Sequence, residues 1–388
     1  MKKKLALFGS LKLGTADYIA HLYPYLAPIF DVKVYSFSHM ANDDLVTATE
    51  SELAFSTIQN PRLLLRPATF KSLAESYIKL TNSLLQFQPQ IFNLHVTAFV
   101  RVLHYFFRPL IADIKKMNSK IVFTMHDVEH IGEKHLINND ILSSFYSLAD
   151  AAIVGNEQEK KLLRQNFSFQ KPTVIAQHGT YNLFDRGAIT VSAAKQKLGY
   201  DSNDFVVLFF GFLRENKGLD ILLKAVAELK NKKLNKTIKL YVAATVRNQY
   251  EQIKLYQNMI ESLGISDKVK VNIQKDSVFN LDEIETYFKA SDCVALPYTT
   301  ISQSGVINLA FGFNKPVIFS DAFISSSELD GKLGIMVPSN NVEKLTEAIE
   351  KMTKNYSEIV SSFNRNIQEY NTIHSWDNIA SALFELSK

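Results

Sequence analysis

The clearest fold signal in this chain is the stretch Phe205-Val-Val-Leu-Phe-Phe-Gly-Phe-Leu-Arg-Glu-Asn-Lys-Gly218. Its first six residues are apolar without interruption, which is typical of a central strand buried on both faces of a parallel sheet. A loop flanked by glycines follows, and Leu219 to Leu229 then has the apolar spacing of a helix. A strand, a loop and a helix in this order predict one crossover unit of an α/β domain.

The same alternation of strands and helices extends in both directions. Earlier strands are expected at Lys4 to Phe8, Val32 to Phe37, Ile91 to Val96, Lys120 to Met125, Ala151 to Val154 and Val174 to Ala176. Later strands are expected at Ile238 to Ala243, Val269 to Ile273, Cys293 to Leu296 and Pro316 to Phe319. The chain turns polar near residues 192–204, and the pattern restarts there. We therefore predict an α/β fold with two domains, residues 1–190 and 191–372, and a C-terminal helix at 373–388.

The composition is that of a folded protein without a membrane span. The 388 residues are 46% hydrophobic, and the longest uninterrupted apolar run is Phe205 to Phe210. That run is far shorter than the roughly 18 residues that a spanning helix needs. The basic start of the chain, Met1 to Lys4, precedes an apolar stretch that is too short for a secretory signal. The single cysteine, Cys293, excludes an internal disulfide and a cysteine-built metal site, and we expect a cytoplasmic protein.

Charge is unevenly divided between the two halves. Residues 1–200 contain 22 Lys and Arg against 16 Asp and Glu, which gives +6. Residues 201–388 contain 21 against 23, which gives −2. Either the halves face different partners, or the difference is chance variation on solvated surfaces. We do not expect nucleic acid to be a partner, because the net charge of the whole chain is only +4.

Candidate binding residues of the first half follow its predicted strands, because ligands of open parallel sheets bind beyond the carboxyl ends of the strands. Gly14 ends a loop after the first strand, where glycine lets backbone amides approach a phosphate, although a plain turn explains it equally well. His126 and Glu129 follow the strand that ends at Met125. Their spacing is not that of the zinc motif H-E-x-x-H, so we expect a substrate contact at His126 rather than a metal.

Candidate residues of the second half suit an anion. Arg214 and Lys217 lie in the glycine-flanked loop, where a fork of donors and a point charge would stabilise a diphosphate, unless the loop is simply solvated. Ser304 is a possible N-cap, and the amides near Gly305 and Val306 would then point at an anion. The alternative is an ordinary capped helix.

Six segments in order along the chain resemble motifs of retaining glycosyltransferases of the GT-B fold, and of family 4-like members in particular. They are His126-Asp127, Val174-Ile-Ala-Gln-His-Gly179, Gly211-Phe-Leu-Arg-Glu-Asn-Lys-Gly218, Ser291-Asp-Cys-Val-Ala-Leu-Pro-Tyr298, Gln303-Ser-Gly-Val-Ile-Asn-Leu-Ala-Phe-Gly-Phe-Asn-Lys-Pro-Val-Ile318 and Ser375-Trp-Asp-Asn-Ile-Ala380. In the third segment the family's arginine usually stands two positions after the glycine, where this chain has Leu213, followed by Arg214. The resemblance covers nearly the whole chain.

The resemblance implies two Rossmann-like domains that face each other across a cleft, with the last helix crossing back to the first domain. It implies retaining transfer of a sugar from a UDP- or GDP-sugar to a glycan or lipid-linked glycan, as in bacterial capsule, exopolysaccharide or O-antigen biosynthesis. On this basis the catalytic residues would be His126, Arg214 and Lys217. Donor binding would involve Arg214 and Lys217 together with Gly14, Gln303, Ser304, Gly305 and Val306, and the acceptor side would hold His126 and Glu129.

No cofactor is expected beyond the nucleotide-sugar substrate. The chain lacks the Asp-x-Asp triplet that often holds a divalent ion in the other large glycosyltransferase fold, so we expect a metal-independent enzyme. One departure matters more, because Ile301 and Leu309 occupy the positions of the family's E-x7-E pair. Two alternatives therefore stay open: a non-catalytic subunit that binds sugar nucleotides, and a nucleotide-sugar epimerase of the same fold.

Membrane contact is suggested by a basic and aromatic segment in the first half. It consists of Arg101-Val-Leu-His-Tyr-Phe-Phe-Arg108 followed by Lys115 and Lys116. Either these residues face acidic lipid head groups at the inner membrane face, giving peripheral attachment, or they form a crossover helix whose aromatic residues pack on the sheet.

Overall fold

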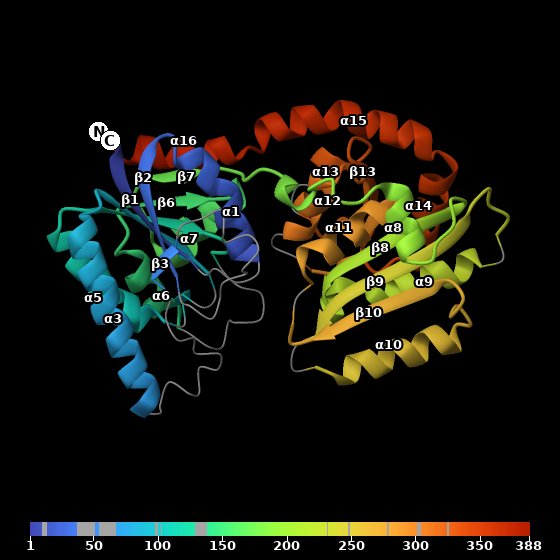
Figure 1. Cartoon of the computed structure of the whole chain (residues 1–388), viewed down its shortest axis with the longest axis horizontal. Coiled ribbons are helices and arrows are strands. Elements are labelled where there is room, and N and C mark those ends of the chain that lie inside the picture. The colour runs from blue at the N-terminus through green and yellow to red at the C-terminus, as the bar shows by residue number, and fades with distance from the viewer. Residues whose placement is uncertain are drawn as a thin grey trace. The chain divides into compact units, whose positions relative to one another are not determined.

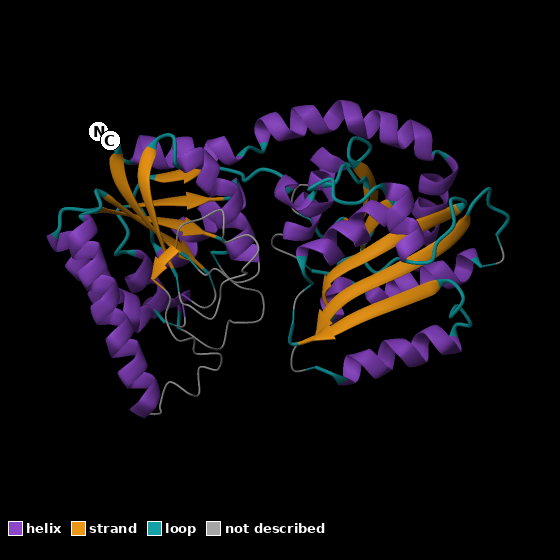
Figure 2. Ribbon diagram, in the orientation of Figure 1, coloured by secondary structure: helices purple, strands orange, loops and turns teal. Residues whose placement is uncertain are grey.

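The computed structural model describes residues 1–9, 14–36, 51–53, 67–97, 100–101, 103–128, 138–230, 232–246, 249–277, 279–300, 304–323 and 326–388. The candidate residues Glu129 and Gln303, and also Ile301, lie outside these ranges. The chain divides into two compact units, Met1–Gly179 with His374–Lys388, and Thr180–Ile373 (Figure 1). Each unit is an α/β structure with helices flanking a sheet, as predicted (Figure 2).

The first unit contains a seven-stranded sheet in the order β3-β2-β1-β4-β5-β6-β7, and neighbouring strands pair in parallel. The strands are β1 (Lys3–Phe8), β2 (Phe30–Tyr35), β3 (Ser51–Leu53), β4 (Ile91–Val96), β5 (Lys120–Met125), β6 (Ala151–Val154) and β7 (Thr173–Ile175). The helices are α1 (Gly14–Leu26), α3 (Pro67–Phe87), α5 (His104–Lys116), α6 (Asn139–Tyr146), α7 (Glu157–Phe167) and α16 (Trp376–Leu386). Every residue of β4 is buried, as a central strand with helices on both faces requires.

The second unit contains a six-stranded parallel sheet in the order β10-β9-β8-β11-β12-β13. The strands are β8 (Asp204–Phe212), β9 (Thr237–Val246), β10 (Val269–Lys275), β11 (Cys293–Leu296), β12 (Val317–Ser320) and β13 (Gly334–Val337). The helices are η3 (Asn182–Phe184), α8 (Val191–Lys197), η4 (Glu215–Lys217), α9 (Leu219–Leu229), α10 (Glu251–Ser262), α11 (Leu281–Ala290), α12 (Gly305–Gly312), α13 (Ser326–Leu329), α14 (Val342–Lys354) and α15 (Tyr356–Ile373). The strand predicted from Phe205 is therefore β8. Its residues Phe205, Val207 and Phe209 lie in one core with α9 and α14, and Phe210 contacts Phe288 of α11.

The division between the units falls earlier than the boundary we predicted at residue 190. Residues 180–190 belong to the second unit, to which hydrogen bonds and an ion pair attach them. The backbone N–H of Tyr181 donates to the carbonyl oxygen of Asn308 at 3.1 Å, and Nη2 of Arg186 lies 3.0 Å from Oε2 of Glu285. The polar stretch after residue 190, which marked the boundary in the sequence, forms α8 and the turn before β8.

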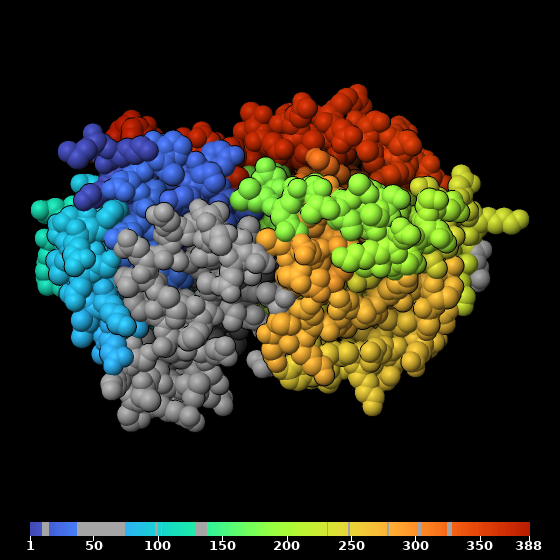
Figure 3. Space-filling model, viewed as in Figure 1, coloured from blue at the N-terminus to red at the C-terminus, as the bar shows by residue number. Residues whose placement is uncertain are grey.

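The C-terminal helix returns to the first unit. The helix α16 lies against α1, and Nζ of Lys3 donates to the carbonyl oxygen of Ser387 at 2.6 Å. The two ends of the chain therefore lie side by side (Figure 3). Within the described ranges, no helix is both long enough and apolar enough to cross a bilayer.

Arg101 to Arg108, the first part of the basic and aromatic segment, is mostly buried, which supports the second of its two interpretations. Arg101 is only 2% exposed, and its Nη1 donates to the carbonyl oxygen of Asp127 at 2.6 Å. Phe106 and Phe107 are buried against the sheet in the core of the first unit. Arg108 donates to the carbonyl oxygen of Ile141 on α6. The segment therefore packs α5 onto the sheet, which was the alternative interpretation.

Candidate functional site

The loop that follows β8 carries the two cations predicted to bind a diphosphate. Gly211, near the end of β8, has a φ of +120°, which only glycine adopts readily, and Phe212 after it still pairs with Thr245 of β9. Arg214 precedes the short helix η4, and Lys217 is its last residue. Gly218 has a φ of +67° and ends η4 where α9 begins. A Cβ on Gly218 would lie 2.0 Å from the carbonyl oxygen of Pro297, so this position needs glycine for conformation and for space.

Two backbone-directed hydrogen bonds join this loop to the segment that follows β11. The N–H of Thr299 donates to the carbonyl oxygen of Asn216 at 2.9 Å. Nδ2 of Asn216 donates to the carbonyl oxygen of Thr300 at 3.0 Å. The strands β8 and β11 are neighbours in the sheet, so their carboxyl ends lie together and the two loops form one surface. Parallel strand pairing thus brings together residues more than 80 positions apart.

Lys217 contacts an aromatic ring on the other loop. Its Nζ lies 3.7 Å from the centroid of the Tyr298 ring. Burial lowers the pKa of Lys217 to about 8, and the charge of Arg214 adds to this effect. Arg214 in turn lies over the ring of Phe212 at 5.4 Å. The two cations are therefore held by aromatic faces, which attract positive charge without neutralising it.

The N-terminus of α12 lies beside the same residues. Ser304 is its N-cap, as predicted, with an extended backbone, and its side chain makes no capping hydrogen bond. Instead its Oγ donates to the Tyr298 hydroxyl at 3.5 Å. A Cβ on Gly211 would lie 3.5 Å from Cγ2 of Val306, so the first turn of α12 borders the end of β8. The partial positive charge of this helix end adds to the charges of Arg214 and Lys217.

Tyr298 is the residue of this site to which the sequence analysis assigned no role. Its ring stacks on Phe323 with centroids 5.3 Å apart, and its carbonyl oxygen accepts a hydrogen bond from Ser320 Oγ at 2.6 Å. These contacts fix the ring on which Lys217 lies. The available signal was an aromatic residue two positions beyond a predicted strand end.

The position of the second family glutamate is occupied by a core residue. Leu309 lies in α12 and is 7% exposed. Its neighbour Asn308 accepts a hydrogen bond from the Tyr370 hydroxyl on α15 at 2.9 Å. This part of α12 is therefore used to pack the helix, and it offers no carboxylate to a ligand.

In the first unit, His126 lies beyond the carboxyl end of β5, as predicted. Its Nε2 lies 2.9 Å from Nδ1 of His95, a residue of β4. The ring of Tyr18 on α1 packs edge-on against His126 at 4.7 Å and against His95 at 5.3 Å. Burial lowers the pKa of His126 to about 3, with a smaller effect from His178. His126 is therefore a neutral imidazole at physiological pH.

Further aromatic contacts extend this group into what we call the histidine cluster: His21, His95, His126, His178, Tyr18 and Trp376. The Trp376 ring stacks with that of His178 at 5.2 Å and with that of His21 at 5.4 Å. A Cβ on Gly179 would lie 2.7 Å from Cδ1 of Trp376, so glycine is needed where α16 docks. Gly14 is the first residue of α1, the helix that supplies Tyr18 and His21. His178 and Trp376 were predicted only as motif residues, and His21 and His95 were missed.

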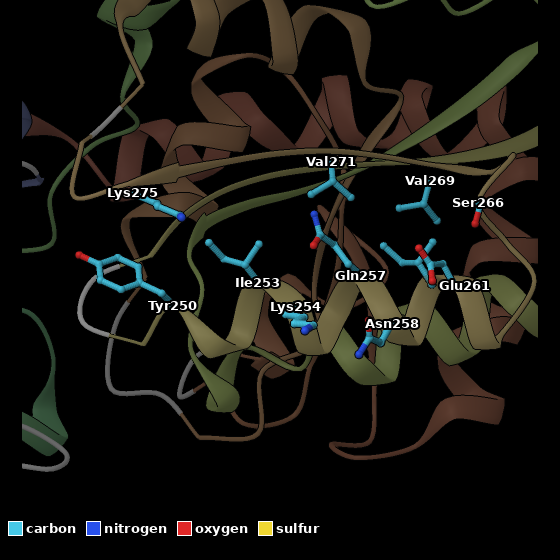
Figure 4. A pocket seen from close by; sticks show the side chains of 11 residues that line it. Tyr250, Ile253, Lys254, Gln257, Asn258, Glu261, Ser266, Val269, Val271 and Lys275 are labelled. Carbon is cyan, nitrogen blue, oxygen red and sulfur yellow. The ribbon is translucent and has the colours of Figure 1, made fainter.

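Two other features of the described ranges bear on ligands. They contain no group of three or more His, Cys, Asp or Glu that is placed to hold a metal ion. A pocket of about 650 Å³ lies between α10 and β10 (Figure 4). Tyr250, Gln257 and Val271 are among its lining residues, and none of the predicted site residues borders it.

A protein-family model matches most of the second unit. Residues 204–355 match the family described as glycosyl transferases group 1. This range runs from β8 to the end of α14 and includes Arg214, Lys217 and Tyr298. A D-inositol 3-phosphate glycosyltransferase of Corynebacterium aurimucosum is 23% identical over 230 residues, which is 58% of this chain and 52% of that protein. The chain thus spans about half the length of the curated relatives it matches.

Solved structures extend the likeness to the whole chain. A sucrose-phosphate synthase from Thermosynechococcus elongatus has a TM-score of 0.75 and 15% identity, with 99% of this chain and 98% of that chain covered. Anabaena HepE in complex with UDP and glucose has a TM-score of 0.72 and 17% identity, with the same coverage. These enzymes have the GT-B fold, and at such identities the likeness shows the fold alone. The predicted GT-B fold is confirmed.

Proposed function

We propose that this chain is a group 1 glycosyltransferase of GT-B fold and that it transfers a sugar from a nucleotide-sugar donor to a hydroxyl acceptor with retention of anomeric configuration. The observation that carries the proposal is the contact of Lys217 with Tyr298 beside Arg214 and the N-terminus of α12. Lys217, Arg214 and the helix end each favour negative charge at the carboxyl ends of β8 and β11.

The proposed chemistry uses this positive surface to stabilise the leaving group. Breaking the bond between the sugar and a nucleoside diphosphate leaves additional negative charge on the diphosphate. Arg214 provides several N–H donors and Lys217 a compact charge, and both are in place before the reaction. Gly14, Gln303, Ser304, Gly305 and Val306 are proposed to contact the donor through the backbone or small side chains. His126 is proposed to contact the reacting sugar, with Glu129 on the acceptor side.

UDP is the first nucleotide to test, and GDP is the second. Anabaena HepE was solved in complex with UDP and glucose, which supports a uridine donor for a chain of the same fold. We propose that no metal is required, because two side-chain cations and a helix end already supply positive charge. Removal of divalent ions with a chelator should then leave the rate of nucleotide release unchanged.

The proposed acceptor is a glycan or lipid-linked glycan of a bacterial surface polysaccharide. The +6 charge of residues 1–200 supports an acidic acceptor or an acidic membrane surface. Since α5 packs inward, peripheral attachment would depend on exposed cations such as Lys116, whose side chain is 76% exposed. Co-sedimentation with anionic and with neutral vesicles tests this attachment. The named activity of the curated relatives makes D-inositol 3-phosphate a second acceptor to assay.

The decisive experiment is a donor panel with these acceptors. The protein is incubated with UDP-, GDP- and ADP-sugars, nucleotide release is followed, and the anomeric configuration of the product is determined by NMR. Acceptor-dependent release and a retained configuration support the proposal. Binding of UDP without release would favour the non-catalytic alternative, and conversion of the donor sugar without an acceptor would favour an epimerase. Absence of both binding and release would exclude the proposal.

A further inference from the structure

The contact between His95 and His126 has a consequence for the proton on His126. His95 lies in β4, pairs with Thr124 of β5 in register, and has no exposed surface. Its Nδ1 lies 2.9 Å from Nε2 of His126, so one of the two nitrogens donates and the other accepts. Two neutral imidazoles allow both directions, and only the surroundings of the other ring nitrogens can distinguish them.

The other ring nitrogen of His95, Nε2, determines which histidine donates in this hydrogen bond. Its Nε2 is buried and has no hydrogen-bond partner in the described part of the chain. The Tyr18 ring packs against the His95 ring in a T-shaped contact, and Gly9 lies close to Cβ and Cγ of His95. Buried N–H groups without an acceptor are rarer in folded proteins than buried acceptors without a donor. Nε2 of His95 therefore carries no proton, and since burial keeps this ring neutral, its proton is on Nδ1.

We propose that His95 is a positioning residue whose Nδ1–H donates to Nε2 of His126 and thereby holds His126 as the tautomer with its proton on Nδ1. The lone pair of Nε2 is then occupied, and Nδ1–H is the only polar group that the ring can offer to a ligand. His126 acts as a hydrogen-bond donor to an oxygen of the substrate and not as a base. This inference rests on the proposed contact of His126 with the reacting sugar.

The tautomer can be measured without any assay of activity. In the full-length protein labelled with ¹⁵N-histidine, long-range ¹H–¹⁵N correlation spectra distinguish the two neutral tautomers of each ring. The signals of His126 are assigned by their loss in His126→Gln. We expect a protonated Nδ1 and an unprotonated Nε2. A proton on Nε2 of His126 in the native protein would overturn the proposal.

Two variants of nearly equal size separate positioning from packing. In His95→Asn the amide Nδ2 can occupy the place of the imidazole Nδ1 and donate, whereas His95→Leu has no donor. We expect His126 to keep the Nδ1–H tautomer in the Asn variant and to lose it in the Leu variant. For sugar transfer we expect kcat of the Leu variant to fall by about tenfold to a hundredfold, with the Asn variant at least about tenfold more active than the Leu variant.

Different results would contradict the positioning role of His95 and the proposed function of the protein. If the Leu variant keeps the Nδ1–H tautomer, or if both variants lose kcat equally while remaining folded, His95 does not position His126. If the tautomers behave as expected but no nucleotide-sugar is turned over by the native protein, the proposed function fails and the role of His95 stands.

Discussion

Nζ of Lys217 lies 3.7 Å from the centroid of the Tyr298 ring, across two loops that follow neighbouring strands. An aromatic face attracts an ammonium group but carries no net charge. A carboxylate in the same place would have paired with the lysine and offset its charge. The contact therefore positions Lys217 and leaves its charge available to an anionic ligand.

Removal of the Lys217 charge should abolish most activity. For Lys217→Ala we expect the rate of nucleotide release to fall by about a hundredfold or more, because a preplaced charge at the leaving group is lost. Thermal unfolding should change little, since Lys217 lies in a loop and is not fully buried. Full activity in a folded Lys217→Ala variant would contradict the assignment of the diphosphate site.

The pH dependence of nucleotide binding should report the lowered pKa of Lys217. Burial lowers this pKa to about 8, so the free protein loses the charge as the pH rises above 8 rather than above 10. We expect the affinity for UDP, measured by calorimetry, to fall above pH 8 by up to about tenfold per pH unit. Lys217→Arg is the matched control, because a guanidinium stays charged throughout and should remove this decline. An identical decline in both proteins would assign it to another group.

The ring of Tyr298, rather than its hydroxyl, should hold Lys217. Tyr298→Phe keeps the aromatic face and removes only the hydroxyl that Ser304 contacts, so we expect UDP affinity within about threefold of the native value. Tyr298→Leu removes the face, and we expect a loss of about tenfold. Thermal unfolding of both variants checks that any loss of affinity does not come from a loss of stability when the stacking on Phe323 changes. Equal affinities of the two variants would show that the ring contact has no role in binding.

Gly218 should tolerate no side chain because a Cβ there would clash with Pro297, and Gly187 provides a control without such a clash. Gly218 and Gly187 have nearly equal positive φ values, +67° and +69°, but only a Cβ on Gly218 would meet another atom, the Pro297 carbonyl oxygen at 2.0 Å. We expect Gly187→Ala to lower the free energy of unfolding by about 1 kcal/mol and Gly218→Ala by clearly more, about 2 kcal/mol or above. Urea denaturation measures both, and equal losses would mean that the loop after β8 can move away from Pro297.

The first unit should lose stability as the pH falls below about 6.5. Burial lowers the pKa of His21 and of His374 to about 4 and of His126 to about 3, and it also lowers the pKa of His95 and His178. Below about pH 6.5, the pKa of histidine in an unfolded chain, these side chains bind protons in the unfolded chain but not in the folded unit. The free energy of unfolding therefore falls as the pH falls. Each fully depressed histidine contributes up to about 1.4 kcal/mol per pH unit.

Asp17 opposes this trend in part. Burial raises its pKa to about 7, so the folded unit holds one proton that the unfolded chain lacks between about pH 4 and 7. The five histidines outweigh that single carboxyl.

Trp376 is the only tryptophan of the chain and lies in the histidine cluster, so its fluorescence during urea denaturation reports the first unit. Equal free energies of unfolding at pH 7.5 and pH 5.5 would show that protonation of the histidines does not destabilise the first unit.

The sequence predicted the elements well where the signal was local. The apolar strand β8 and the N-cap at Ser304 depend on neighbouring residues, and both were predicted, although β8 also includes Gly211 and Phe212, which we expected in the loop. The same local signals left two interpretations of Arg101 to Arg108 open, and the buried side chains of Arg101, Phe106 and Phe107 support the packed helix. Periodicity shows that a helix has an aromatic face, but only packing decides whether a sheet covers that face.

The amino-acid sequence by itself determined the two α/β units and the residues that follow each strand, because helical and strand periodicities act within a few positions. Only the tertiary structure decided what those residues touch. Parallel pairing of β8 with β11 brings the Tyr298 ring to Lys217, and pairing of β4 with β5 brings His95 to His126. A histidine in the apolar strand β4 was visible in the sequence, but its partner was not. Contacts between residues distant along the chain depend on strand order and register, which no local pattern encodes.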